Sequence, residues 1–74
     1  MKLEKTCKCI ENSSFLKGTT TGEVCDFIKG REYQVDIFTS FNKAEYYKVY
    51  QNGGYDDWSL LDSKEFSKNF EEIG

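Results

Sequence analysis

Residues 31–50 read REYQVDIFTSFNKAEYYKVY. In the first half of this stretch, Tyr33, Val35 and Ile37 alternate with polar residues. A period of two is typical of a β-strand that buries one face and exposes the other. The pattern therefore predicts a strand over residues 31–38, and its regularity makes this strand the reference for the rest of the chain.

The second half of the stretch predicts the partner of that strand, over residues 45–51, after a loop at 39–44. A symmetrical hairpin would form two pairs on the buried face and two on the outer face: Ile37 with Tyr47, Val35 with Val49, Asp36 with Lys48, and Phe38 with Tyr46. Opposite charges and facing aromatic rings are favourable cross-strand neighbours. Both strands therefore agree on which face is buried.

A second hairpin is predicted at Asn52-Gly53, because a type I′ turn needs positive φ at both of its central residues. This turn would lead into a third strand over residues 54–61. It would also place Trp58 opposite Tyr47 on the buried face. Three consecutive strands joined in this way form an antiparallel meander.

Two further strands are predicted before the central hairpin. Residues that favour β-structure alternate with charged ones over 3–10, and a shorter run of the same kind covers 23–28. The stretch between them, 11–22, is rich in Asn, Ser, Thr and Gly and reads as a polar loop.

The C-terminal stretch changes to a helical period. Asp62 or Ser63 can cap a helix, and Phe66 and Phe70 then share one helical face that can cover an open end of the barrel. We therefore predict a mainly β fold, a small SH3-like barrel of about five antiparallel strands with a short C-terminal helix. It forms a single domain over residues 1–74.

The composition excludes several classes of function. The net charge is −3, from 10 Lys and Arg against 13 Asp and Glu, whereas a nucleic-acid binder usually carries a basic surface. No histidine is present, which removes Ser-His-Asp and Cys-His catalysis, so we expect a protein that is not an enzyme and needs no cofactor. No apolar run approaches the ~18 residues of a membrane span and no signal peptide is visible, so we expect a cytoplasmic protein without a membrane partner.

The three cysteines predict buried free thiols. Cys7 and Cys9 are two positions apart, so in a strand they point to the same face, where free cysteine behaves as a small apolar side chain. Structural zinc almost always takes four cysteine or histidine ligands, so Cys7, Cys9 and Cys25 form an incomplete set. We expect no metal site.

The best candidates for a binding site are aromatic residues on the outer face of the central hairpin. Contiguous exposed apolar patches mark interaction sites, and tyrosine is frequent among interface hot spots. With neighbours from the following loop, the candidate set is Phe38, Phe41, Tyr46, Tyr50, Tyr55, Asp56 and Asp57. The alternative is that residues 11–22 or the C-terminal helix cover these rings.

The run Phe27-Ile28-Lys29-Gly30-Arg31-Glu32-Tyr33-Gln34-Val35 resembles the F-x-K-G-K-x-Y-x-V signature of small phage and prophage proteins, with arginine in place of the second lysine. The resemblance implies an SH3-like barrel. Some small phage proteins of this size counter host defences by binding a host protein or a signalling nucleotide. No catalytic residues come with the resemblance.

Three hypotheses about function follow. In the first, the protein is a phage-encoded binding module that inhibits a host protein, such as a component of a defence system, in the host cytoplasm. In the second, it is an oligomer that sequesters a small molecule or nucleotide, so a homo-oligomer remains open. In the third, it is a nucleic-acid accessory protein, which would require its lysines to converge on one face.

Overall fold

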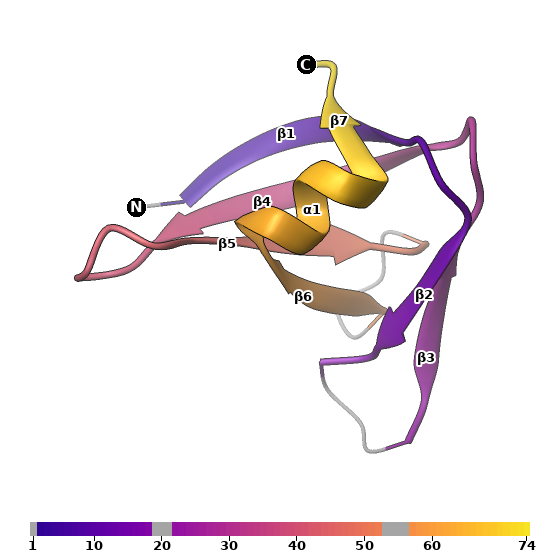
Figure 1. Ribbon diagram of the computed structural model, residues 1–74, viewed down its shortest axis with the longest axis horizontal. Helices are drawn as coiled ribbons and strands as arrows, with labels where there is room; N and C mark the ends of the chain where they lie inside the picture. The colour runs from indigo at the N-terminus through magenta and orange to yellow at the C-terminus, as the bar shows by residue number, and fades with distance from the viewer. Residues whose placement is uncertain (1, 19–21, 53–56) are drawn as a thin grey trace.

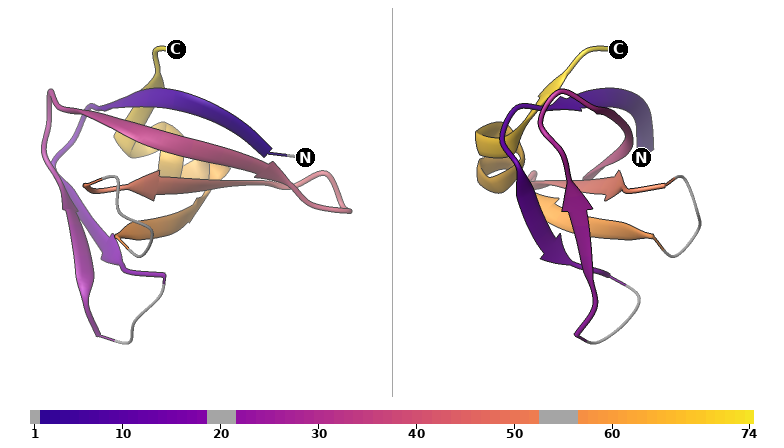
Figure 2. Two further views of the ribbon diagram at one scale, coloured as in Figure 1. Left: turned by 180° about the vertical axis from the view of Figure 1, so that it is seen from behind. Right: turned by 90° about the vertical axis from the view of Figure 1, so that its right-hand side faces the viewer.

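The chain folds around one curled antiparallel sheet. In this computed structural model, which describes residues 2–18, 22–52 and 57–74, five strands follow the order β6-β5-β4-β1-β7 across the sheet (Figure 1). The strands of this sheet are β1 (Lys2–Cys9), β4 (Glu32–Thr39), β5 (Glu45–Tyr50), β6 (Trp58–Asp62) and β7 (Phe70–Glu72). The sheet forms a half-barrel with a short C-terminal helix, which confirms the predicted mainly β, SH3-like fold (Figure 2).

The β4–β5 hairpin has the predicted register. Val35 lies opposite Val49 and both are fully buried, whereas Phe38 lies opposite Tyr46 on the other face. The meander continues into β6 as expected, and β1 pairs with the other side of β4. The alternating stretch identified in the sequence therefore forms the centre of the sheet.

The connection from β5 to β6 differs from the predicted two-residue turn. Tyr47 pairs with Leu61 and Tyr50 with Trp58, so β5 ends at Tyr50 and β6 begins at Trp58; Gly53 of the predicted turn lies outside the described residues. Trp58 therefore lies on the outer face, and the prediction that it faces Tyr47 in the core is wrong. The register that buries Leu61 prevails over the local preference of Asn52-Gly53 for a tight turn, because side-chain burial on one face sets strand register.

A two-stranded ribbon, β2 (Ser13–Leu16) paired with β3 (Val24–Phe27), crosses one end of the sheet (Figure 1, Figure 2). The prediction of a polar loop over 11–22 is therefore wrong at Ser13–Leu16. Burial alternates along β2, but only Phe15 packs against the core as an apolar side chain, and the sequence Ser-Ser-Phe-Leu does not show the alternation of apolar and polar residues that predicts a strand. The hydroxyl of Ser59 donates to the Phe15 carbonyl at 3.2 Å and ties the ribbon to β6.

The helix α1 (Ser63–Asn69) begins at the predicted capping box. The Glu65 N–H donates to the Asp62 carboxylate at 2.8 Å, and the Asp62 N–H donates to the Glu65 carboxylate at 3.2 Å. Phe66 is buried and stacks on Tyr47 with ring centroids 4.1 Å apart, so packing stabilises a helix too short to form alone. No helix among the described residues is long and apolar enough to cross a membrane.

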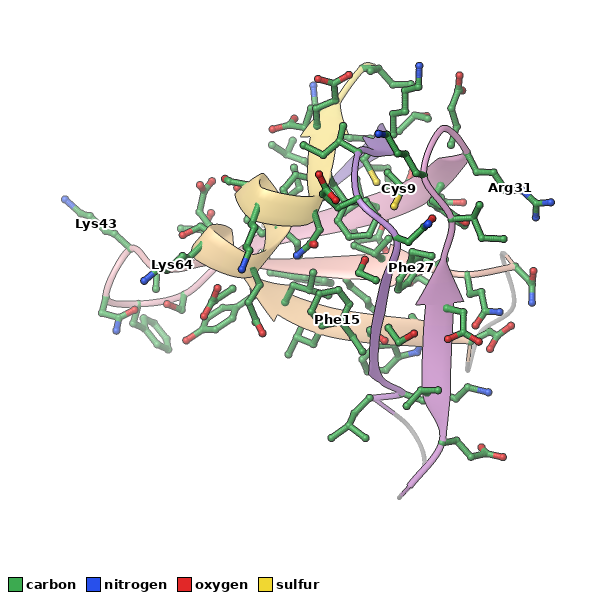
Figure 3. All side chains as sticks on the ribbon, turned by 45° about the vertical axis from the view of Figure 1, so that its right-hand side comes forward. Cys9, Phe15, Phe27, Arg31, Lys43 and Lys64 are labelled. Carbon is green, nitrogen blue, oxygen red and sulfur yellow. The ribbon has the colours of Figure 1, made fainter. Side chains whose placement is uncertain are left out.

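The core lies between the half-barrel, the ribbon and α1. Phe27 meets Tyr33 and Phe70 edge to face, with ring centroids 5.0 and 5.2 Å away. Figure 3 shows Phe15 and Phe27 directed from the ribbon toward this core. The three cysteines are buried as predicted and are free thiols, and burial raises the pKa of Cys7 to about 12.

Candidate protein-docking surface

The outer face of β4, β5 and β6 carries exposed apolar side chains in adjacent positions. Phe38, which is half-buried, forms a cross-strand pair with Tyr46, and Leu60 on β6 lies diagonally across from Tyr46, because its direct partner is Lys48. Tyr46 is 39% exposed and Leu60 is 53% exposed. The sheet therefore presents an apolar strip that no described element covers.

The tip of the β4–β5 hairpin adds a fully exposed ring, that of Phe41. Around it the turn is closed by backbone bonds between Ser40 and Ala44 at 2.9 Å and between Lys43 and Ser40 at 3.0 Å. The Asn42 side chain accepts from the Ser40 hydroxyl and from the Ala44 N–H. Lys43 lies in the left-handed region with φ of 66°, and Figure 3 shows it at the far end of the hairpin.

These hydrogen bonds restrain the backbone of the turn that presents Phe41. A preordered group loses less conformational entropy when it binds a partner than one on a flexible loop. We call Phe38, Phe41, Tyr46 and Leu60 together the hairpin patch.

Tyr50 shares the outer face but has a structural role. Its hydroxyl donates to the Asp36 carboxylate at 2.8 Å, and Asp36 is only 3% exposed although it sits at an outward position of β4. Burial raises the pKa of Tyr50 to about 12, and the hydrogen bond to Asp36 and the negative charges of Asp36 and Glu4 act in the same direction. The predicted binding residue Tyr50 therefore supports the sheet beside the patch.

Lys48 and Trp58 join Tyr50 in a group of contacting side chains on the outer face. The Lys48 ammonium lies 4.2 Å from the centre of the Trp58 ring and 5.4 Å from that of Tyr50, within cation–π distance of both. Gly18 donates its N–H to the Trp58 carbonyl at 2.8 Å and approaches the indole so closely that a β-carbon at position 18 would overlap the ring. The segment after β2 thus covers Trp58 and leaves the hairpin patch exposed.

The acidic part of the predicted site does not join the patch. Asp57 pairs with the Lys17 ammonium at 3.1 Å and accepts from the Asn52 amide at 2.7 Å, and these two bonds lower the pKa of Asp57. Tyr55 and Asp56 lie outside the described residues. Leu60 was missed, because its outward position depends on the β5–β6 register that the sequence did not predict.

A shallow depression of about 490 Å³ lies on the ribbon. Its lining consists of Asn12, Ser13, Ser14, Asp26, Phe27 and Ile28. This lining has no cationic side chain and includes one carboxylate, to which the Ser14 hydroxyl donates at 2.5 Å. The depression therefore suits a nucleotide phosphate poorly, since phosphates bind at cations and clustered N–H donors.

No family model, curated protein or solved structure matches the chain.

Proposed function

We propose that the protein is a non-enzymatic binding module that docks on another protein through the hairpin patch. The observation that supports this most directly is the complete exposure of Phe41 on a hydrogen-bonded turn. Burying a phenylalanine of this kind in a pocket is worth about 1.5–3 kcal/mol, and aromatic anchors of this type are the usual hot spots of interfaces.

The chemistry of the remaining surface favours a protein partner over nucleic acid. Lys8 on β1 is flanked by Glu32 on β4 and Glu71 on β7, and Lys17 pairs with Asp57. Interleaved charges of this kind do not attract a phosphate backbone, which requires an accumulation of positive charge. The resemblance to small phage proteins suggests the setting: a phage accessory protein in the host cytoplasm that inhibits a host protein, with a defence protein as the leading candidate.

The test is capture from a bacterial host lysate with three immobilised proteins: the wild type, Phe41→Ser, and Leu16→Ser as a control. Leu16 is 68% exposed on the ribbon, so the control also removes an exposed apolar side chain, but one outside the patch. We expect one host protein, identified by mass spectrometry, to be retained by the wild type and the control and reduced at least tenfold by Phe41→Ser.

Two results would contradict the proposal. One is retention of the same proteins by all three immobilised chains. The other is a native mass of the purified protein that shows a homo-oligomer carrying a small bound molecule, which would favour the sequestering hypothesis instead.

A further inference from the structure

The two edge strands of the five-stranded sheet, β7 and β6, differ in how well they are protected against pairing with another chain. β7 carries Glu71 and Glu72, and charged residues on an edge strand discourage pairing with another chain. The central residues of β6, Ser59, Leu60 and Leu61, have no charge. Of the two edges, β6 is therefore the one that can accept another strand.

The hydrogen-bond pattern shows which backbone groups of β6 point to this edge. The Gln51 N–H donates to the Asp57 carbonyl at 2.7 Å. In an antiparallel ladder, hydrogen-bonded and non-hydrogen-bonded pairs alternate, so the N–H and carbonyl groups of Trp58, Leu60 and Asp62 point away from β5.

The two ends of this edge are already occupied. The Trp58 carbonyl accepts from the Gly18 N–H at 2.8 Å, and the Asp62 N–H donates to the Glu65 carboxylate at 3.2 Å. Between them, the N–H and carbonyl of Leu60 have no hydrogen bond to any group in the part of the chain that the structure describes. Leu60 thus combines an open donor and acceptor with a half-exposed apolar side chain that belongs to the hairpin patch.

We propose that the β6 edge at Leu60 binds an extended segment of a partner protein as an additional strand. This inference rests on the proposed docking function and names the form of the partner. A strand on this edge would exchange two main-chain hydrogen bonds with Leu60, and its side chains on the outer face would lie beside the Leu60 side chain.

Charge defines the partner segment further. The carboxylates of Asp62 and Glu65 lie at the α1 end of the edge and are exposed, and the chain has a net charge of −3. The segment that fits is therefore one in which apolar residues alternate with lysine or arginine. A second copy of this chain brings the same acidic groups and the same net charge, so it fits less well.

The probe for this test is a displayed library of random 12-residue peptides, selected on the wild-type protein. Leu60→Ala and Leu60→Pro both remove the leucine side chain, but only proline also removes the outward N–H, and proline is tolerated on edge strands at such positions. Glu72→Pro is the matched control on β7, because the bond from the Ile73 N–H to the Thr6 carbonyl at 2.9 Å shows that the Glu72 N–H points away from β1.

We expect selected peptides to alternate apolar and basic residues. Loss of one main-chain hydrogen bond should weaken their binding to Leu60→Pro about tenfold relative to Leu60→Ala. Glu72→Pro should bind them as the wild type does. If Leu60→Pro does not melt cooperatively as the wild type does, amide hydrogen exchange at Leu60 of the wild-type protein replaces the binding comparison as the readout. This exchange should slow when a selected peptide binds.

Four results would overturn the inference: equal binding by Leu60→Pro and Leu60→Ala, no selected peptides, unchanged exchange at Leu60, or a wild-type dimer that Leu60→Pro abolishes. The Phe41→Ser capture experiment separates this inference from the proposed function. If lysate capture depends on Phe41 while Leu60→Pro has no effect, docking through the patch stands and strand addition does not.

Discussion

Replacing Tyr50 with phenylalanine removes a single hydroxyl group from the outer face of the sheet. That hydroxyl donates to the carboxylate of Asp36 at 2.8 Å, and Asp36 is 3% exposed. Water cannot readily take the place of the lost donor at a carboxylate buried to this extent. The substitution therefore tests whether Tyr50 stabilises the sheet or belongs to the binding surface.

The expected cost follows from the type of hydrogen bond. A hydrogen bond to a charged group contributes about 1.5–3 kcal/mol, and an acceptor left without its donor bears a desolvation penalty. For a domain of this length each kcal/mol corresponds to roughly 4–8 °C in Tm, so Tm should fall by about 6 °C or more. Urea unfolding followed by circular dichroism measures the change in the free energy of unfolding.

The matched control is Tyr46→Phe. Tyr46 lies on the same strand and the same face, but it is 39% exposed and belongs to the hairpin patch. Removal of its hydroxyl should change the free energy of unfolding by less than about 0.5 kcal/mol. If Tyr50→Phe is as mild as Tyr46→Phe, Asp36 does not depend on Tyr50 and the structural role assigned to Tyr50 is wrong.

Alkaline pH provides a second test of the same contact. The pKa of Tyr50 is raised from 10.0 to about 12 in the folded protein, so above pH 10 the unfolded chain loses this proton first. The stabilising effect of Tyr50 is therefore complete below pH 10 and is lost as pH rises toward 12. The difference in stability between the wild type and Tyr50→Phe should narrow over this interval, and a constant difference would contradict the assignment.

Three further predictions concern the core and its cover. Phe66→Ala removes the ring stacked on Tyr47 and should cost about 3–5 kcal/mol in urea unfolding; a cost below about 1 kcal/mol would mean that α1 contributes little to the core. Gly18→Ala should displace the Trp58 ring, lower stability by about 1–3 kcal/mol and shift the emission of the single tryptophan, whereas unchanged emission would refute that contact. Because the Cys7 thiol is buried and its pKa is raised to about 12, iodoacetamide at pH 8 should alkylate Cys7 only as fast as the protein unfolds, and rapid labelling of the native protein would show that Cys7 is accessible.

The central hairpin could be predicted in detail because its information is local. In β4, Val35 and Ile37 face the core through simple alternation, and the short turn after Thr39 sets the register to β5. The capping box at Asp62 is equally local, since both of its hydrogen bonds join residues three positions apart. Elements of this kind depend on neighbours that the sequence itself places side by side.

Elements that depend on distant partners were predicted less well. β2 has one apolar contact to the core and exists because β3 pairs with it, and the three-residue β7 exists because β1 offers an edge. The β5–β6 register was wrong because burial of Leu61 outweighed the local preference of the Asn-Gly pair. None of these outcomes can be derived from the period of hydrophobic residues.

The residues of the candidate surface also divide into those that local pattern predicted and those that only the folded structure revealed. The sequence by itself placed Phe38 and Tyr46 on one outer face, because alternation determines which face of a strand each side chain occupies. Only the tertiary structure showed that Tyr50 is committed to a buried Asp36, that Gly18 covers Trp58, and that Leu60 completes an exposed strip. Alternation assigns a side chain to a face, but exposure depends on what other parts of the chain bring to that face, and that is decided only when the whole fold packs.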